Sequence, residues 1–261
     1  MSLIRDSISA IGRLVVNFFE DAGMAVMLWF KATVLVFLPP WRFRIVFKQC
    51  EQIGLRSLPV VMVSATFIGM VFGMHSFSGF SRFGASSLAP TVVALAITRE
   101  MAPVITALMV AGRAGAAMTA EIGSMKVTEQ IEALRTLATN PIKYLAVPRL
   151  IAGTLMLPML TIFADACGLF GGYIVSTTMM GMSPQLYIHS TWDALYPSDI
   201  LGGLMKATFF GFAIALICTH YGFKTKGGAE GVGISTTKSV VVSSMTILIS
   251  DFFLTRLLMW G

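Results

Sequence analysis

Residues 58–80 read LPVVMVSATFIGMVFGMHSFSGF, a stretch without a single Asp, Glu, Lys or Arg. A helix needs about 20 mostly apolar residues to cross a bilayer, so this stretch predicts a membrane span. Four more such stretches follow, at residues 88–112, 150–178, 200–222 and 239–260. The sequence therefore predicts an all-α polytopic membrane protein with five transmembrane helices in a single domain, residues 1–261.

The composition agrees with a membrane protein and excludes other classes. Of the 261 residues, 56% are hydrophobic and 12% are charged, whereas soluble domains are about 25% charged. No GxxxxGK[ST] phosphate loop is present, so ATP binding is not expected on this chain. The three cysteines have no CxxC spacing, which gives no metal site. Neither catalytic residues nor an enzymatic activity are predicted.

The positions of the basic residues predict the topology. Fifteen of the 19 Lys and Arg residues fall before the first span, between spans two and three, or between spans four and five, whereas Arg82 is alone in the loops of the other side. Cytoplasmic loops carry the excess of Lys and Arg. The N-terminus is therefore expected in the cytoplasm and the C-terminus outside. The net charge of +6 reflects this topology rather than nucleic-acid binding.

The first 40 residues have an amphipathic pattern. Ile4, Ile8, Ile11 and Val15 recur at helical spacing, which predicts a helix lying in the membrane surface. The apolar run 22–38, which ends before Pro39 and Pro40, leaves a sixth span as the alternative.

Two adjacent charges lie within the second predicted span. Arg99 and Glu100 fall near its middle, where a charge is costly and commonly functional. A guanidinium is suited to phosphate, so contact with a lipid head group is one interpretation. A structural ion pair of Arg99 with Asp165 or Asp251 is the other, and the sequence leaves both open.

Four phenylalanines lie at the outer end of the first span and just beyond it: Phe72, Phe77, Phe80 and Phe83. Aromatic side chains commonly anchor a span at the interface. A wall that grips acyl chains is the functional alternative.

The loop between spans two and three contains a short helical pattern at residues 127–140. Ile131, Leu134 and Ala138 form one stripe, and Glu129 and Glu132 share another face. A helix held in a cytoplasmic loop is suited to docking a soluble partner; an interfacial helix without a partner is the alternative.

An ordered set of motifs resembles the MlaE (YrbE-like) permease family. The motifs are TREMAPV at 98–104, AGRAG at 111–115, AEIGSM at 120–125, TEQIEAL at 128–134 and Pro148-Arg149, and the resemblance covers about residues 55–258. The sequence has Ala102 where the family usually has glycine.

The resemblance implies a permease subunit of an ABC-type phospholipid transporter, located in a bacterial inner membrane. It implies a homodimer, a cytoplasmic ATPase dimer that holds ATP and Mg, a periplasmic ring of MCE-domain proteins and a small cytoplasmic accessory protein. By position, phospholipid would bind in a cavity between two permeases lined by Phe72, Phe77, Phe80, Phe83, Arg99 and Glu100. Glu129, Glu132 and Arg135 would lie on the coupling helix. The alternatives are an ion-coupled secondary transporter and a membrane scaffold that transports nothing.

Overall fold

The computed structural model describes residues 23, 26–28, 30–35 and 43–260. In this part the backbone forms helices and short turns, with no strand. The elements are α2 (Phe43–Cys50), η1 (Glu51–Leu55), α3 (Leu58–Ser81), η2 (Ser86–Leu88), α4 (Ala89–Ala96), η3 (Ile97–Met101), α5 (Ala102–Val110), η4 (Ala111–Gly115), α6 (Ala116–Val127), α7 (Gln130–Thr136), η5 (Ile142–Ala146), α8 (Val147–Thr178), α9 (Pro184–Ala194), α10 (Pro197–Lys224) and α11 (Gly228–Trp260). The η elements are π-helical turns, except for η2, which is a 3-10 turn.

Five helical stretches of the described chain are long and apolar enough to cross a membrane, which confirms the polytopic all-α class. They are Phe43–Ser81, Ser86–Val127, Ile142–Thr178, Pro197–Lys224 and Gly228–Leu258. Each is longer than its predicted span because a charged residue ends an apolar run without ending the helix. The second has 42 residues, about 63 Å at 1.5 Å per residue. A bilayer core is only about 30 Å thick, so this helix projects from the membrane.

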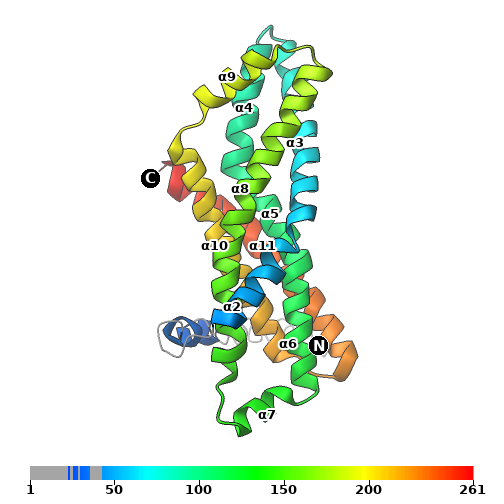
Figure 1. Ribbon diagram of the computed structural model, residues 1–261, viewed down its shortest axis with the longest axis vertical. Helices are drawn as coiled ribbons and strands as arrows, with labels where there is room; N and C mark the ends of the chain where they lie inside the picture. The colour runs from blue at the N-terminus through cyan, green and yellow to red at the C-terminus, as the bar shows by residue number, and fades with distance from the viewer. Residues whose placement is uncertain (1–22, 24–25, 29, 36–42, 261) are drawn as a thin grey trace, which may run out of the picture.

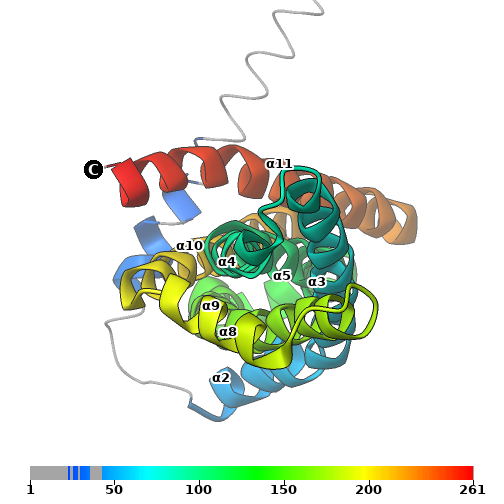
Figure 2. The same cartoon turned by 90° about the horizontal axis from the view of Figure 1, so that it is seen from above.

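The helices form an elongated bundle (Figure 1). The short helix α7 lies at one end, called here the α7 end, and α9 lies near the opposite end, called the α9 end. The upper part in this view consists of α3, α4, α8 and α9. The last helix, α11, crosses the bundle obliquely on its outside, as the view along the long axis also shows (Figure 2).

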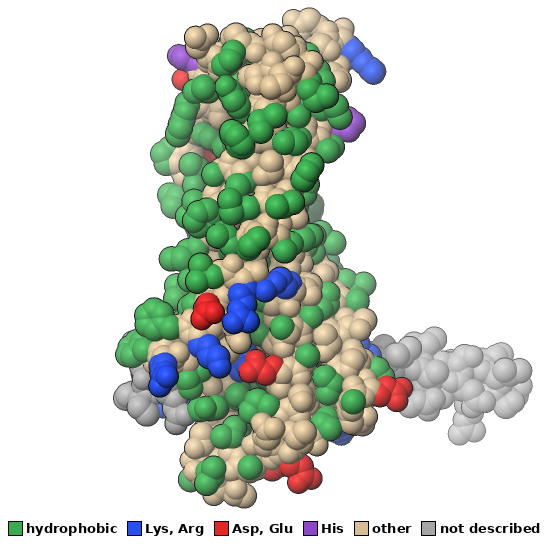
Figure 3. Space-filling view, turned by 45° about the vertical axis from the view of Figure 1, so that its right-hand side comes forward, with side chains coloured by type: hydrophobic (Ala, Val, Ile, Leu, Met, Phe, Trp, Pro, Cys, Tyr) green, Lys and Arg blue, Asp and Glu red, His purple; other side chains and the backbone are tan. Residues whose placement is uncertain are grey.

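Charged side chains are unevenly distributed along the bundle. On the face shown in Figure 3, hydrophobic side chains cover most of the upper part, and most Lys, Arg, Asp and Glu side chains gather toward the α7 end. This separation is expected where the upper part lies in lipid and the lower part reaches an aqueous surface.

Glycines allow α3 and α8 to pack in direct backbone contact. A methyl group added at Gly69 would overlap the carbonyl group of Gly168, and one at Gly171 would overlap that of Thr66. Without water to drive association in the membrane, such close backbone contact is a main source of helix–helix stability.

The predicted interfacial helix over residues 1–40 falls largely outside the described residues and stays a prediction. Its described part is helical from Val26 to Leu35 apart from residue 29, which lies outside the description. Ala32 is buried against Val147, Leu150 and Ala215, so this segment packs on α8 and α10.

We predict that Gly69→Ala destabilises the protein by about 1–3 kcal/mol, because overpacking a close contact forces backbone shifts. The measurement is the Tm of the detergent-solubilised protein. Gly79→Ala, in the same helix but with nothing within 4 Å of the added methyl, is the control. Equal Tm values for the two variants would contradict the packing role of Gly69.

Candidate functional site

A π-helical turn interrupts the second span at the two charged residues. The turn η3 covers Ile97–Met101 and runs into α5, where Pro103 follows two residues later. Proline has no N–H, so it cannot donate to the carbonyl group four residues earlier, that of Arg99. Isolated π-helical turns within helices are frequent at functional sites. Pro103 therefore offers the Arg99 carbonyl group no N–H from the usual α-helical position.

The side chain of Lys206, on α10, donates a hydrogen bond to the Arg99 carbonyl oxygen. Its Nζ lies 3.1 Å from the Arg99 carbonyl oxygen, 2.6 Å from Glu100 Oε2 and 2.6 Å from Thr255 Oγ1. Asp251 Oδ1 is 3.1 Å away and completes the ion pairing. The ammonium is fully enclosed, with 0% of the side chain exposed. Because the ammonium donates three hydrogen bonds and has two carboxylates as counter-ions, the cost of placing it in the membrane is offset.

A glycine brings α10 close enough for these contacts. Gly203 lies one turn before Lys206, and a methyl group there would overlap the carbonyl oxygen of Thr98. Glycine at this position therefore permits the approach of α10 to η3 that inserts the lysine.

Arg99 points to a different acid from those expected. Its guanidinium pairs with Asp199 at 2.6 Å and donates a second bond from Nε to Oδ1 at 2.9 Å. The predicted partners, Asp165 and Asp251, are therefore wrong. Asp199 also accepts the backbone N–H of Tyr196 at 3.1 Å, so Arg99 holds the start of α10. This contact joins residues 100 positions apart, which no local pattern reveals.

Asp251 pairs with Lys206 instead, and Asp165 is buried within α8. In the described part of the chain, Asp165 Oδ1 has no hydrogen-bond partner.

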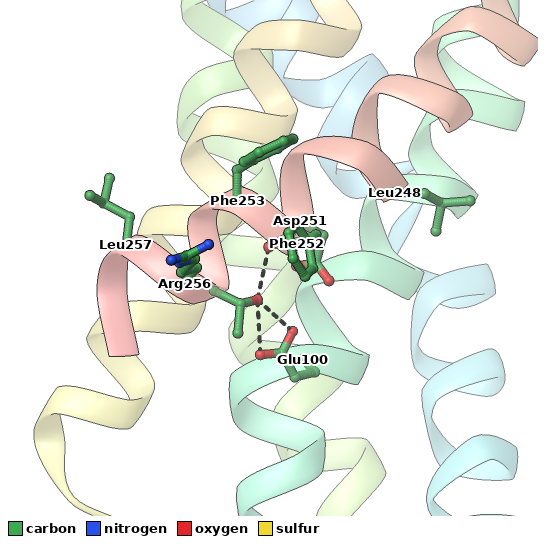
Figure 4. Close-up of a pocket in the computed structure, with 8 residues that line it drawn as sticks. Glu100, Leu248, Asp251, Phe252, Phe253, Arg256 and Leu257 are labelled. Carbon is green, nitrogen blue, oxygen red and sulfur yellow. Dashed lines mark hydrogen bonds between the residues drawn. The ribbon is translucent and has the colours of Figure 1, made fainter. Parts of the chain in front are cut away.

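An open groove lies beside the lysine, with a volume of about 930 Å³. Its lining combines the polar side chains of Glu100 and Asp251 with apolar side chains from several sides of α11 (Figure 4). The lining residues are Glu100, Leu248, Asp251, Phe252, Phe253, Thr255, Arg256 and Leu257. The Thr255 hydroxyl lies 3.2 Å from both carboxylate oxygens of Glu100. This volume is in the range of ligand-binding pockets.

The α11 side of the groove is exposed, as are apolar side chains on the other spans. Phe252 and Phe253 are each 64% exposed, and Leu257 is 69% exposed. Large exposed apolar surfaces mark contacts with lipid or with another chain.

Of the residues predicted to bind lipid, the groove contains Glu100 alone. Phe72, Phe77 and Phe80 lie on α3 and Phe83 follows it, 85% exposed; none of the four lines the groove. Phe72 packs partly against the core around Val93. Their contact with lipid stays a prediction, as does that of Arg99.

Most residues of the site were not predicted. They are Lys206 and Asp199 in the ion pairs, and Leu248, Asp251, Phe252, Phe253, Thr255, Arg256 and Leu257 in the groove. Lys206, like Arg99, is a charged residue inside a predicted span, and such residues are commonly functional. The sequence therefore contained a signal that pointed to Lys206. Thr255 and Asp199 carry no such signal in the sequence. No cluster of three or more His, Cys, Asp or Glu suited to a metal occurs among the described residues.

At the α7 end, the expected coupling helix is shorter than residues 127–140. The helix α6 continues to Val127, and the chain turns at Glu129, which has a left-handed backbone conformation with φ 59°. The helix α7 then ends at Thr136, because the chain turns again at Ala138, φ 53°. Ile131 is buried against Ile122 and Leu145, whereas Ala138, which was predicted to share its stripe, lies beyond the end of α7.

The two acids of this segment have different surroundings. Glu132 pairs with Lys126 at 2.5 Å and with Arg135 at 2.9 Å. The hydrogen bond from Lys126, helped by the charge of Arg135, lowers the pKa of Glu132. These pairs therefore persist at neutral pH and are lost only as the pH falls through that lowered pKa. Glu129 is exposed and directly precedes α7, the helix at one end of the bundle (Figure 1).

We predict that Lys206→Met lowers the free energy of unfolding by about 3–5 kcal/mol, because it leaves Glu100 and Asp251 without their counter-ion. The measurement is Tm in detergent. The control is the triple variant Glu100→Gln/Lys206→Met/Asp251→Asn, which removes both signs of charge together and regains most of the lost stability. A triple variant no more stable than Lys206→Met would refute the pairing.

Comparison with known proteins adds the family context. Residues 46–257 match the family profile described as Permease MlaE. A probable ABC transporter permease protein of Rickettsia felis is 43% identical over 95% of this chain and 96% of its own length. The intermembrane phospholipid transport system permease protein MlaE of Haemophilus influenzae is 37% identical over 98% of each chain. The Arabidopsis thaliana protein TRIGALACTOSYLDIACYLGLYCEROL 1, chloroplastic, is 41% identical over 82% of this chain and 61% of its own length.

Proposed function

Because this chain belongs to the MlaE permease family, we propose that it is the membrane-spanning subunit of an ABC transporter that moves phospholipid between the inner and outer membranes. The chain spans the inner membrane several times. Its N-terminus lies in the cytoplasm and its C-terminus in the periplasm. The protein itself is not an enzyme: ATP is hydrolysed by a separate cytoplasmic subunit that holds ATP and Mg.

The observation that carries this proposal is the groove of about 930 Å³ over the ionic cluster. Its wall consists of exposed apolar side chains of α11 and its floor holds Glu100 and Asp251, with the cation of Arg256 at its side (Figure 4). A phospholipid has both matching parts, because acyl chains suit the phenylalanines and a phosphate suits a guanidinium.

A second copy of the chain would close the groove. The most apolar part of α11 is only 11% buried within one chain, against 44% for the corresponding parts of the second, third and fourth spans. Two copies placed with their α11 faces toward each other would cover this surface and enclose a shared chamber. A twofold arrangement of this kind is the commonest assembly of identical chains.

The α7 end provides the link to the ATPase. The helical stretch Ser86–Val127 carries Glu100 and leads directly into the turn before α7. From Glu100 to Val127 it is roughly 40 Å long. Closure of two ATPase subunits against α7 would therefore be transmitted along one rigid element to the floor of the groove. The MCE-domain ring belongs at the opposite, α9 end, and the small accessory protein on the ATPase side.

We predict that Phe252→Ala/Phe253→Ala lowers the amount of co-purified phospholipid several-fold, because it removes the aromatic wall of the groove. Mass spectrometry of lipids extracted from the purified protein measures this. The matched control is Phe67→Ala/Phe170→Ala, which removes two exposed phenylalanines outside the groove lining. Equal lipid content in the two double variants would contradict the binding role of the groove.

We predict that Glu129→Lys weakens ATPase binding about fivefold or more, since it reverses an exposed charge directly before α7 without breaking an internal ion pair. Affinity capture with the tagged permease measures the ATPase retained. Glu230→Lys, a reversal of another exposed acid at the start of α11, serves as the control. Full retention by Glu129→Lys would remove this residue from the docking surface.

The energy source separates the proposal from its rivals. With the permease and its partners reconstituted in vesicles, phospholipid transfer should require ATP. Transfer driven by an ion gradient alone would favour a secondary transporter, and no transfer under either condition would favour a scaffold.

A further inference from the structure

A separate cavity of about 170 Å³ lies between two π-helical turns. Gln52 and Ile53 of its lining belong to η1, and Arg113 and Ala114 belong to η4. Isolated π-helical turns within helices are frequent at functional sites. The remaining lining residues come from α2, from the turn after η1 and from α6: Gln49, Arg56, Ala117, Met118 and Glu121. The cavity shares no lining residue with the groove beside Lys206.

One cation of this lining has no acidic partner. Arg113 donates to Ser57 Oγ at 3.0 Å and to the Gln52 carbonyl oxygen at 3.5 Å, and it pairs with no carboxylate of the described residues. The other two charged residues of the lining have counter-ions, Glu51 for Arg56 at 3.4 Å and Arg149 for Glu121 at 2.7 Å. One positive charge is therefore unbalanced among these side chains, and a guanidinium is suited to phosphate.

Two acceptor atoms of the lining lack a donor. Gln49 is 5% exposed, and its Oε1 is buried without a hydrogen-bond partner. Glu121 contacts Arg149 through Oε2, and its other carboxylate oxygen, Oε1, has no partner in the described part of the chain. A buried acceptor without a donor is costly. The cavity therefore favours a ligand that brings N–H or O–H groups as well as a negative charge.

The cavity lies at the level where two spans leave the apolar layer. Arg56 lies two residues before α3, and Arg113 directly follows the apolar run 88–112. Exposed apolar side chains belong to the same region, Phe47 on α2 and Leu55 on η1. Exposed apolar residues beside charged ones at the ends of spans are typical of the membrane–water interface. Lipid head groups are therefore the abundant ligands at this level.

We propose that this cavity binds the head group of a phospholipid that carries a primary ammonium, as in phosphatidylethanolamine. The phosphate contacts the Arg113 guanidinium, and the ammonium donates hydrogen bonds to Gln49 Oε1 and Glu121 Oε1. A primary ammonium has three N–H donors, whereas the choline ammonium has none. The cavity is smaller than the roughly 300–1,000 Å³ of pockets that enclose a whole ligand, so it holds the head group while the acyl chains remain in the membrane.

Native mass spectrometry of the protein in nanodiscs tests this assignment. The nanodiscs contain phosphatidylcholine mixed with phosphatidylethanolamine or with its N,N-dimethyl derivative, and the retained lipids are counted. Wild type retains phosphatidylethanolamine about tenfold better than phosphatidylcholine, with the dimethyl lipid between them, because methylation removes N–H donors. Arg113→Gln weakens the retention of phosphatidylethanolamine about tenfold, as expected for the loss of a charge-assisted contact with phosphate.

Two further variants separate recognition of the ammonium from that of the phosphate. Gln49→Leu lowers the preference for phosphatidylethanolamine over phosphatidylcholine several-fold, while its Tm is no lower than that of wild type, because the variant removes an unpaired buried acceptor. Arg113→Lys keeps the positive charge and restores most of the retention that Arg113→Gln loses. An unchanged preference in Gln49→Leu would overturn the ammonium site.

The matched control is Arg44→Gln, which changes an exposed arginine of α2 outside the lining and retains lipid as wild type does. Equal retention by Arg44→Gln and Arg113→Gln would overturn the proposal, as would equal retention of phosphatidylethanolamine and phosphatidylcholine by wild type. Stronger retention of phosphatidylglycerol, which is anionic and has no ammonium, would reassign the cavity to an anionic head group and overturn the proposal too.

Soluble phosphoethanolamine, added as a competitor, distinguishes the lipid from a free zwitterion. At millimolar concentration it leaves the lipid bound, and full displacement would overturn the lipid site. Phe252→Ala/Phe253→Ala, which changes the groove, keeps the preference for phosphatidylethanolamine. Loss of that preference would place the counted lipid in the groove and overturn the second site, whereas absence of ATP-driven transfer would refute the proposed function and leave the result at the cavity standing.

Discussion

The Lys206 ammonium is the interaction on which the membrane part of this structure depends. It is fully enclosed, and it contacts the two carboxylates, the hydroxyl and the backbone carbonyl that surround it. These groups come from two helical stretches, η3 and α11, and the lysine comes from a third, α10, so a single cation fixes the three relative to one another. The cluster can persist in the membrane because each charge has a counter-ion within 3.1 Å.

The same cluster explains why the groove has a polar floor. Glu100 and Asp251 retain 34% and 21% side-chain exposure although both pair with the lysine. Of the residues that line the groove, Arg256 is the cation suited to the phosphate of the proposed ligand, whereas the two acids are not. Arg99 has a different role in this geometry, because its ion pair with Asp199 sets where α10 begins. The two adjacent charges of the TREM motif therefore serve two separate contacts, both with residues of α10.

The sequence was sufficient for the features that depend on local composition. Apolar runs located all five spans, and the charge rule identified Arg99 and Glu100 as unusual. The partners of these charges could not be predicted, because the Arg99–Asp199 and Glu100–Lys206 contacts depend on how α10 packs on η3. That packing in turn depends on Gly203 and on the carbonyl group freed by Pro103. The helix α7 was predicted in the right loop but too long, since left-handed residues at Glu129 and Ala138 have no signature in residue type.

The central claim is that phospholipid occupies the groove between the ionic cluster and α11. A phospholipid with a photoreactive group on its acyl chain, activated in membranes that contain the assembled protein, tests it most directly. Peptide mapping of the adducts gives the position of the chain. The account predicts that adducts concentrate on Leu248, Phe252, Phe253 and Leu257. Adducts spread evenly over outward-facing residues of α3 and α8, with none enriched on α11, would contradict it.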